Sequence, residues 1–243
     1  MIQDSLKAHY EYVCQHYHKQ QILGVFLYGS QNYNTDTPAS DIDTKVIYIP
    51  TLEELAFNQP VSKELVLPNG EHCEVKDIRE MVKNFKKQNI NFLEVLFTKY
   101  YIINPKYEQL WNEYFIANRE KIARYDVDAA VKSMTHQAIH TLNQDPTNPK
   151  KVSNALRLLY FLEGYIRQDD YMSCLCSYNN RAEILRNIKE GKYQGLGLLS
   201  NVISISLEEY KRADLKHLTD PVNKNHVDIL LNEACIKLIK LII

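Results

Sequence analysis

Ile22-Leu-Gly-Val-Phe-Leu-Tyr-Gly-Ser30 is the stretch that decides the fold of this 243-residue chain. Its first seven residues form an apolar run too short for a typical helix, which predicts a strand buried on both faces and ended by Gly-Ser. Polar residues follow as far as Ser40. The next stretch, Asp41-Ile-Asp-Thr-Lys-Val-Ile-Tyr-Ile49, alternates and is rich in β-branched residues, so it predicts a second strand ending at Pro50.

Two carboxylates, Asp41 and Asp43, stand at the start of this second stretch. On a strand, residues i and i+2 point to the same face and lie about 7 Å apart. Two such carboxylates repel each other unless a proton or cation compensates, and their oxygens favour Mg²⁺ or Mn²⁺ over zinc. Upstream, Gly29 allows the backbone to approach an anion, and Ser30 adds a hydroxyl donor. The sequence therefore predicts a site for a divalent cation and a triphosphate.

The rest of the chain predicts an α+β fold. A helix over residues 1–21 precedes the first strand, and a hairpin about the Asn69-Gly70 turn follows the second, with strands at 63–67 and 71–76. Asp77, with Glu80 three residues later, is typical of a helix start. Helical periodicity then covers the segments near 91–98, 105–118, 127–143, 150–168, 179–190, 200–213 and 223–242. We expect a small mixed β-sheet domain with flanking helices over residues 1–104 and a mostly α-helical domain over residues 105–243.

The composition excludes several classes of protein. Lys and Arg number 29 and Asp and Glu 30, for a net charge of −1, which argues against a protein that coats DNA. Five irregularly spaced cysteines and the lack of a hydrophobic leader before Asp4 predict a cytoplasmic protein rather than a secreted disulfide scaffold. The apolar segment 236–243 is too short to cross a bilayer, so we expect no membrane association. The oligomeric state stays open.

A strand, Gly-Ser, and Asp-x-Asp on the next strand together resemble the nucleotidyltransferase superfamily of DNA polymerase β. The chain looks like the predicted nucleotidyltransferases of bacteria and phages, with good coverage over residues 20–105 and weaker coverage beyond. The stretches that carry this likeness are Leu27-Tyr-Gly-Ser-Gln-Asn-Tyr33, Thr37-Pro-Ala-Ser-Asp-Ile-Asp43, Glu74-Val-Lys-Asp-Ile-Arg79 and Asn89-Ile-Asn-Phe-Leu-Glu-Val-Leu96. The resemblance implies metal-dependent transfer of a nucleoside monophosphate from an NTP, such as ATP, to a hydroxyl, with release of pyrophosphate.

The resemblance also implies a third metal-binding carboxylate on a neighbouring strand. Glu74 lies within the second hairpin strand, whereas Asp77 lies where the helix begins. We therefore assign catalysis and metal binding to Asp41, Asp43 and Glu74, and helix capping to Asp77, which stays the alternative third ligand. Glu71 has the opposite strand parity to Glu74 and is a weaker candidate.

Basic residues of the helical segment are expected to close over the phosphates. Lys150 and Arg157 share a helical face, so we predict that they bind the NTP together with Gly29 and Ser30.

Three classes of function remain open at this point. The first is the nucleotidyltransferase, whose acceptor is an RNA end such as that of tRNA, a protein side chain, or a small molecule such as an aminoglycoside. The second is a catalytically silent module that binds nucleotides or regulates another protein. The third is a toxin–antitoxin or phage-defence component whose helical segment binds a protein partner. The balanced charge argues mildly against long nucleic acids as partners.

Overall fold

The computed structural model describes residues 2–242, without the side chain of Asn179. A five-stranded mixed sheet forms its centre, in the order β3-β4-β2-β1-β5. The strands are β1 (Ile22–Tyr28), β2 (Asp43–Tyr48), β3 (Ser62–Val66), β4 (His72–Asp77) and β5 (Tyr101–Ile103). β2 runs parallel to β4, and the other neighbouring pairs are antiparallel. The chain thus has a mixed α/β fold.

The sequence predicts four of these strands. The first strand and the hairpin lie where the apolar run and the turn indicate them, and Gly70 has φ +87°, a left-handed conformation that glycine adopts without strain. The second strand begins at Asp43, so Asp41 lies in the connection before it. The sequence does not predict β5, because three residues are too few to show a period.

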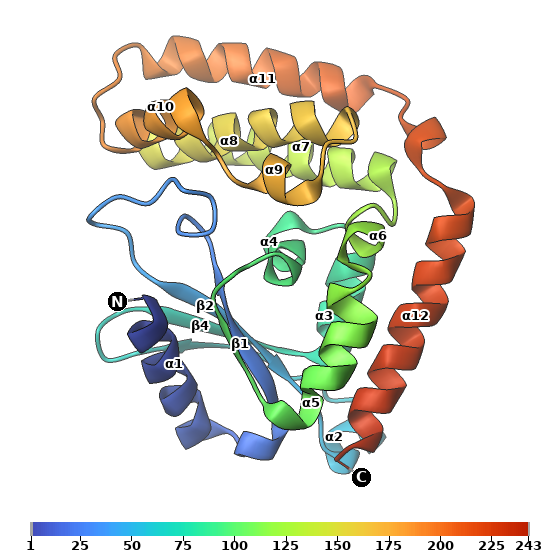
Figure 1. The fold of residues 1–243 in the computed structure, drawn as a ribbon. Helices are drawn as coiled ribbons and strands as arrows, with labels where there is room; N and C mark the ends of the chain where they lie inside the picture. Colours follow the sequence, from blue (N-terminus) through green and yellow to red (C-terminus); the bar gives the residue numbers. More distant parts are fainter. Residues whose placement is uncertain (1, 243) are drawn as a thin grey trace.

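Helices cover both faces of the sheet (Figure 1). On one face lies α1 (Ile2–His16), whose Leu6 and Val13 pack with Val25 and Leu27 of β1. On the other lie α3 (Ile78–Lys86) and α4 (Ile90–Leu93), where Phe26 belongs to the larger core. β1 is therefore buried on both faces, as its uninterrupted apolar sequence predicts.

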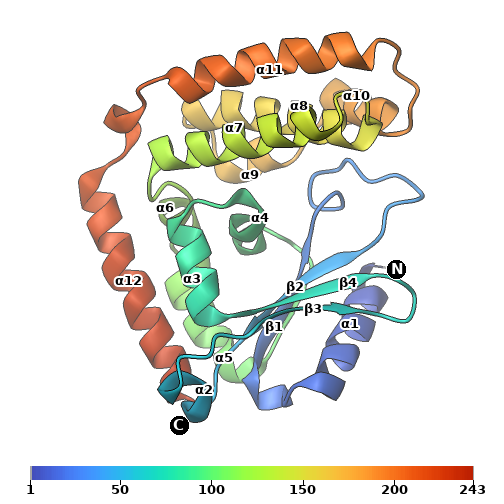
Figure 2. The ribbon, with the colours of Figure 1, turned by 180° about the vertical axis from the view of Figure 1, so that it is seen from behind.

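A layer of helices lies beyond one end of the sheet, as Figures 1 and 2 show from opposite sides. It consists of α7 (Val127–Gln144), α8 (Pro149–Ile166), α9 (Tyr171–Leu175), α10 (Asn179–Lys189) and α11 (Leu196–Arg212). The other helices are α2 (Leu52–Ala56), α5 (Pro105–Leu110) with a π-helical continuation over Trp111–Ile116, α6 (Arg119–Ala123) and α12 (Pro221–Lys240). Short 3₁₀ turns lie at Lys19–Gln21, Glu94–Leu96 and Lys216–Leu218.

One hydrophobic core joins the sheet to these helices. It contains Leu23 and Phe26 of β1, Leu162 of α8 and Leu238 of α12. α12 returns beside α3 and α5, as Figure 2 shows. The division at residues 104 and 105 stays a prediction, and the core is continuous across it.

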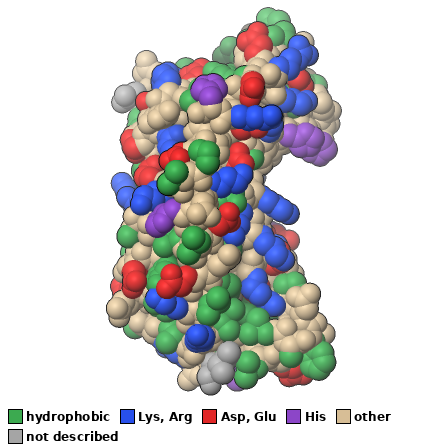
Figure 3. All heavy atoms as spheres, turned by 90° about the vertical axis from the view of Figure 1, so that its right-hand side faces the viewer, with side chains coloured by type: hydrophobic (Ala, Val, Ile, Leu, Met, Phe, Trp, Pro, Cys, Tyr) green, Lys and Arg blue, Asp and Glu red, His purple; other side chains and the backbone are tan. Residues whose placement is uncertain are grey.

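The surface carries mixed charge. Figure 3 shows acidic and basic side chains interspersed with hydrophobic ones on the face that includes α12. No helix within residues 2–242 has the combination of length and apolar sequence that crossing a membrane requires.

Candidate functional site

A cavity of about 230 Å³ lies between the β1–β2 connection and the helical layer. It receives side chains from β1, from the connection that follows it, and from α7, α8 and α10. The lining residues are Tyr28, Gly29, Ser30, Tyr33, Asp41, Asp43, Asn91, Gln137, Ala138, Thr141, Lys150, Asn154, Ala155, Arg157, Leu158 and Lys189. Segments far apart in the sequence thus form one site.

Most of the residues singled out in the sequence meet in this cavity. Gly29, Ser30, Asp41 and Asp43 line it from the sheet side, and Lys150 and Arg157 line it from α8. α8 begins after Asn148, whose side chain accepts a hydrogen bond from the Lys151 amide, with Pro149 at the first helical position. Lys150 lies in the first turn of α8, and Arg157 lies seven residues further along the helix.

Arg157 is a buried cation whose donors are only partly satisfied. Its side chain is 6% exposed, and its guanidinium lies 3.7 Å from the centre of the Tyr33 ring. Its Nε and Nη1 atoms are buried and have no hydrogen-bond partner among the described residues. Buried donors without partners cost free energy, and an anionic ligand bound here would supply the hydrogen-bond acceptors that the protein itself does not offer.

Glu94 organises the turn that carries Gly29 and Ser30. The carboxylate of Glu94 is fully buried and accepts hydrogen bonds from the Gly29 amide at 3.0 Å, the Asn32 side chain at 3.3 Å and the Tyr33 hydroxyl at 2.7 Å. Burial raises the pKa of Glu94 above its ordinary value, although these donors act in the opposite direction. Gly29 has φ +88° at this turn.

The expected contact of Gly29 with a phosphate stays a prediction, and the Gly29 amide already has a partner. Gly29 lines the cavity, but its N–H donates to Glu94. The hydroxyl of Ser30 remains as a donor on this side of the cavity.

Asp41 and Asp43 both line the cavity. Burial raises the pKa of Asp43, and the neighbouring charge of Asp41 raises it further. His72 and Lys150 act in the opposite direction. β2 and β4 run parallel, and Thr44 lies opposite Cys73. The residues one position earlier are Asp43 and His72, so the neighbour of Asp43 on β4 is a histidine and not an acid. No local pattern in the sequence indicates this neighbour.

Glu74 does not line the cavity and is held by two lysines. It pairs with Lys45 in the β2–β4 register and forms an ion pair with the Lys45 ammonium, which is buried over the Tyr28 ring. Its other oxygen lies 3.2 Å from the Lys76 ammonium. Burial raises the pKa of Glu74, but the two lysines outweigh burial and hold that pKa below its ordinary value. Its assignment to a metal stays a prediction, and both of its oxygens already have partners.

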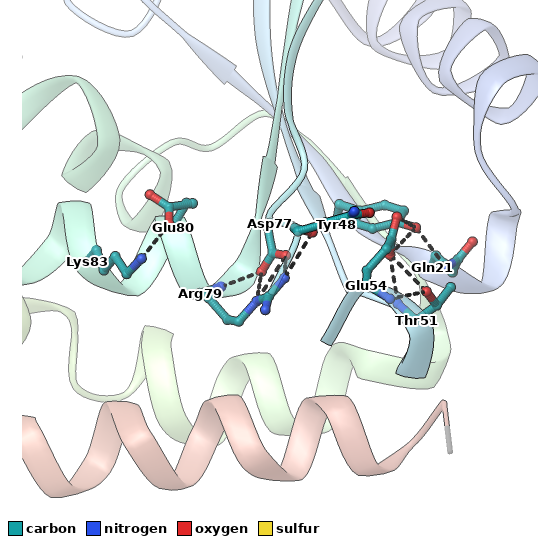
Figure 4. Close-up of polar contacts among 9 residues, drawn as sticks. Gln21, Tyr48, Thr51, Glu54, Asp77, Arg79, Glu80 and Lys83 are labelled. Carbon is teal, nitrogen blue, oxygen red and sulfur yellow. Dashed lines mark hydrogen bonds and ion pairs between the residues drawn. The ribbon is translucent and has the colours of Figure 1, made fainter. Parts of the chain in front are cut away.

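Asp77 caps α3, as the sequence indicates. Its carboxylate accepts a hydrogen bond of 2.8 Å from the Arg79 amide and binds the Arg79 side chain (Figure 4). Asp77 pairs with Tyr48 in the register, at the opposite end of β2 from Asp43, which corresponds to about 16 Å along the strand. Asp77 is thus too far from Asp43 to share a cation with it.

Lys189 of α10 is a site residue that sequence reasoning missed. Its ammonium donates to the Ser40 hydroxyl at 2.9 Å and to the Thr35 carbonyl at 3.5 Å, beside Asp41. Burial lowers the pKa of Lys189, and the charge of Lys150 lowers it further. Nothing in its local sequence distinguishes Lys189 from Lys192, which is exposed and paired with Glu190.

The acidic residues of the cavity fit a metal only in part. Within residues 2–242, no group of three or more His, Cys, Asp and Glu side chains is placed to hold a metal ion. Mg²⁺, however, is commonly bound by one or two carboxylates together with substrate phosphates. Asp41 and Asp43 fit that mode, in which they would hold the cation beside a bound phosphate.

Comparison with models of known protein families gives no match for this chain, and comparison with curated proteins gives none either. The resemblance to nucleotidyltransferases therefore stays a prediction that rests on the residues named above.

Proposed function

We propose that this protein is a metal-dependent nucleotidyltransferase that transfers a nucleoside monophosphate from an NTP to a hydroxyl acceptor. The observation that carries the proposal is the meeting of Asp41 and Asp43 with the unsatisfied guanidinium of Arg157 in one cavity. Paired carboxylates suit a hard divalent cation, and a buried arginine with free donors suits a phosphate. A nucleoside triphosphate with its cation needs both.

Each group has a role that follows from its position. Asp41 and Asp43 would hold Mg²⁺ or Mn²⁺ together with phosphate oxygens of the substrate. The bound cation supplies charge neutralisation and Lewis acidity at the reacting phosphate. Lys150 and Arg157 neutralise and orient the phosphates from the side of α8, and the Ser30 hydroxyl donates to them from the side of β1. Glu94 is a positioning residue, because it holds the turn and does not touch the cavity.

A second candidate is a nucleotide-binding module without turnover. Two observations favour it: Glu74 is held by Lys45 and Lys76, and the Gly29 amide is bonded to Glu94. A site with only two free carboxylates can bind a nucleotide with its cation and still lack the group that activates an acceptor hydroxyl.

The test is incubation of the protein with each α-³²P-labelled NTP, Mg²⁺ or Mn²⁺, and three separate acceptor pools: total RNA, cell protein and small hydroxylated metabolites. Transfer of label to one pool, with release of pyrophosphate, supports the transferase. Asp41→Asn/Asp43→Asn is the matched control, since it preserves side-chain size and removes both charges.

Two results would count against this assignment. Label transfer that persists in the double variant would remove the roles of Asp41 and Asp43. Metal-dependent binding of NTP without transfer to any pool would favour the module without turnover.

A further inference from the structure

The cavity holds more positive charge than its two carboxylates balance. Lys150 and Arg157 of α8 and Lys189 of α10 line it together with Asp41 and Asp43, so the lining side chains carry one more positive than negative charge. Glu94, which attracts Arg157, and Asp36, which attracts Lys189, do not line the cavity. None of these three basic side chains forms an ion pair within 4.0 Å with a described carboxylate. By contrast, Lys86, Lys132 and Arg181 all have carboxylate partners.

Lys189 and Arg157 differ from the surface cations of this protein in the partners that their side chains contact. Within residues 2–242, the hydrogen-bond partners of Lys189 are neutral, the Ser40 hydroxyl and the Thr35 carbonyl, and Asp41 and Asp36 attract it without forming an ion pair. The guanidinium of Arg157 lies over an aromatic ring, and two of its donors have no partner in the part of the chain that the structure describes. Both are partly or fully removed from solvent, where a charge–charge contact is stronger than it is in water. These are the conditions in which a cationic site binds an anion most strongly.

We propose that Arg157, Lys150 and Lys189 form a polyphosphate-binding site that is filled without any divalent cation, so that the number of phosphates in the ligand governs affinity. The inference rests on the proposed function for its choice of ligand, and it adds Lys189 to the residues that bind substrate. It also sets an order of events: the polyphosphate binds first, and Asp41 and Asp43 would then hold a divalent cation beside it, which would supply charge neutralisation.

The size of the cavity agrees with a polyphosphate. Its volume of about 230 Å³ lies below the roughly 300–1,000 Å³ of pockets that enclose drug-sized ligands. A cavity of this size encloses the charged part of a nucleotide and leaves the remainder near the opening. Three cations in one small cavity favour a chain of phosphates over a single phosphate, because each further phosphate brings another charge-assisted contact.

The fold also gives Lys189 a second task. The connection it contacts carries Ser30 at its start and Asp41 at its end. α10 holds this connection at a further point, where Arg186 donates to the Asn34 carbonyl at 3.3 Å. A polyphosphate bound to Lys189 therefore contacts the same side chain that holds Thr35 and Ser40, in the segment that leads to Asp41.

Isothermal titration calorimetry of the full chain in EDTA tests the inference. The probes are sodium tripolyphosphate, pyrophosphate and orthophosphate, which carry no base or sugar. We expect tripolyphosphate to bind in EDTA, with pyrophosphate weaker and orthophosphate weakest. Arg157→Lys and Lys189→Met should each weaken tripolyphosphate binding roughly tenfold or more, the effect of removing one charge-assisted hydrogen bond.

Two matched controls separate the site from general charge. Arg181 lies over the Tyr160 ring at 4.4 Å, as Arg157 lies over Tyr33, but it is paired with Glu163. Lys192 lies three residues from Lys189 and is mostly exposed. Arg181→Lys and Lys192→Met should bind tripolyphosphate as the wild type does. Thermal unfolding of each variant shows whether it is folded, and Lys189→Met tests the inference independently of buried Arg157.

The results separate this inference from the proposed function. Binding of tripolyphosphate only when Mg²⁺ is present, or equal affinity in Arg157→Lys, Lys189→Met and the controls, would overturn the inference even if label transfer is found. Binding in EDTA with the expected order supports it even if no acceptor is labelled, in which case only the transferase proposal fails.

Discussion

Replacing Arg157 with methionine should make the ligand-free protein more stable and unable to bind polyphosphate. Arg157 is 6% exposed, and its Nε and Nη1 atoms have no partner among the described residues. In the ligand-free protein, these unsatisfied donors lower the free energy of unfolding. Methionine removes the charge and both unsatisfied donors, and its flexible chain can still pack on the Tyr33 ring.

The size of the effect follows from the interactions that the substitution removes, both favourable and unfavourable. Each buried donor without a partner costs about 1–3 kcal/mol, so relief of two contributes about 2–6 kcal/mol. The substitution also removes the cation–π interaction with the Tyr33 ring, about 0.5–2 kcal/mol, and the attraction between Arg157 and the Glu94 carboxylate. The difference between the first two contributions is about 0–5.5 kcal/mol, and the lost attraction to Glu94 reduces it. We therefore expect a net stabilisation of about 1–3 kcal/mol, which raises the Tm of a chain of this length by roughly 2–12 °C.

Thermal unfolding in phosphate-free buffer with EDTA measures the difference. Addition of tripolyphosphate at about 100 times its Kd should stabilise the wild type by about 2.7 kcal/mol, whereas Arg157→Met should be stabilised much less. Arg181→Met is the control, because Arg181 is half-exposed and already paired with Glu163. Its stability should change by no more than about 1 kcal/mol.

Destabilisation of Arg157→Met by more than about 1 kcal/mol in the ligand-free state would refute this reasoning. It would mean that Arg157 stabilises the fold through its stacking on the Tyr33 ring and that its unsatisfied donors do not mark an anion-binding site.

Three further predictions concern the other charged residues of the site. Glu74→Gln should destabilise the protein by about 3 kcal/mol in urea unfolding, because it leaves the Lys45 ammonium buried without a carboxylate. Mg²⁺ alone should change the stability of the wild type and of the variant equally. A Mg²⁺ effect confined to the wild type would make Glu74 a metal ligand. Asp41→Asn/Asp43→Asn should abolish label transfer, yet calorimetry in EDTA should show tripolyphosphate bound at least as tightly, since two repelling charges are gone. Burial and the charge of Lys150 hold the pKa of Lys189 below 10.5, and only the protonated amine attracts an anion. The affinity for tripolyphosphate measured by calorimetry should therefore be full below that lowered pKa and fall as pH rises through it. Lys189→Met should lack this fall.

Local sequence predicts the elements whose signals are local. The apolar run of β1 and the Asn69-Gly70 turn specify their structure within a few residues, and both lie where they are expected. β5 has no such signal, because its three residues become a strand only by pairing with β1. The expected start of β2 is two residues too early, since polar Asp41 fits the end of a loop as well as the start of a strand.

The site is predictable where one helix face or one short motif determines it. Lys150 and Arg157 reach the cavity together because helical geometry places residues seven apart on one face. Lys189 requires the packing of α10 against α8 and the β1–β2 connection, which no local pattern encodes. Glu94 has the sequence context of a residue near a helix start, and its burial beneath Gly29 follows only from the three-dimensional position of the turn.

The division of charge between the two parts of the chain explains why the site depends on both. The β1–β2 connection and β2 supply the carboxylates Asp41 and Asp43, and the helical layer supplies the cations of α8 and α10. Carboxylates alone would repel a triphosphate, and cations alone would bind it without a place for Mg²⁺. One core joins the sheet to the helices, so close packing connects the elements that carry the two sets of charges. This division of charge supports the proposal that the cavity takes a polyphosphate together with a divalent cation.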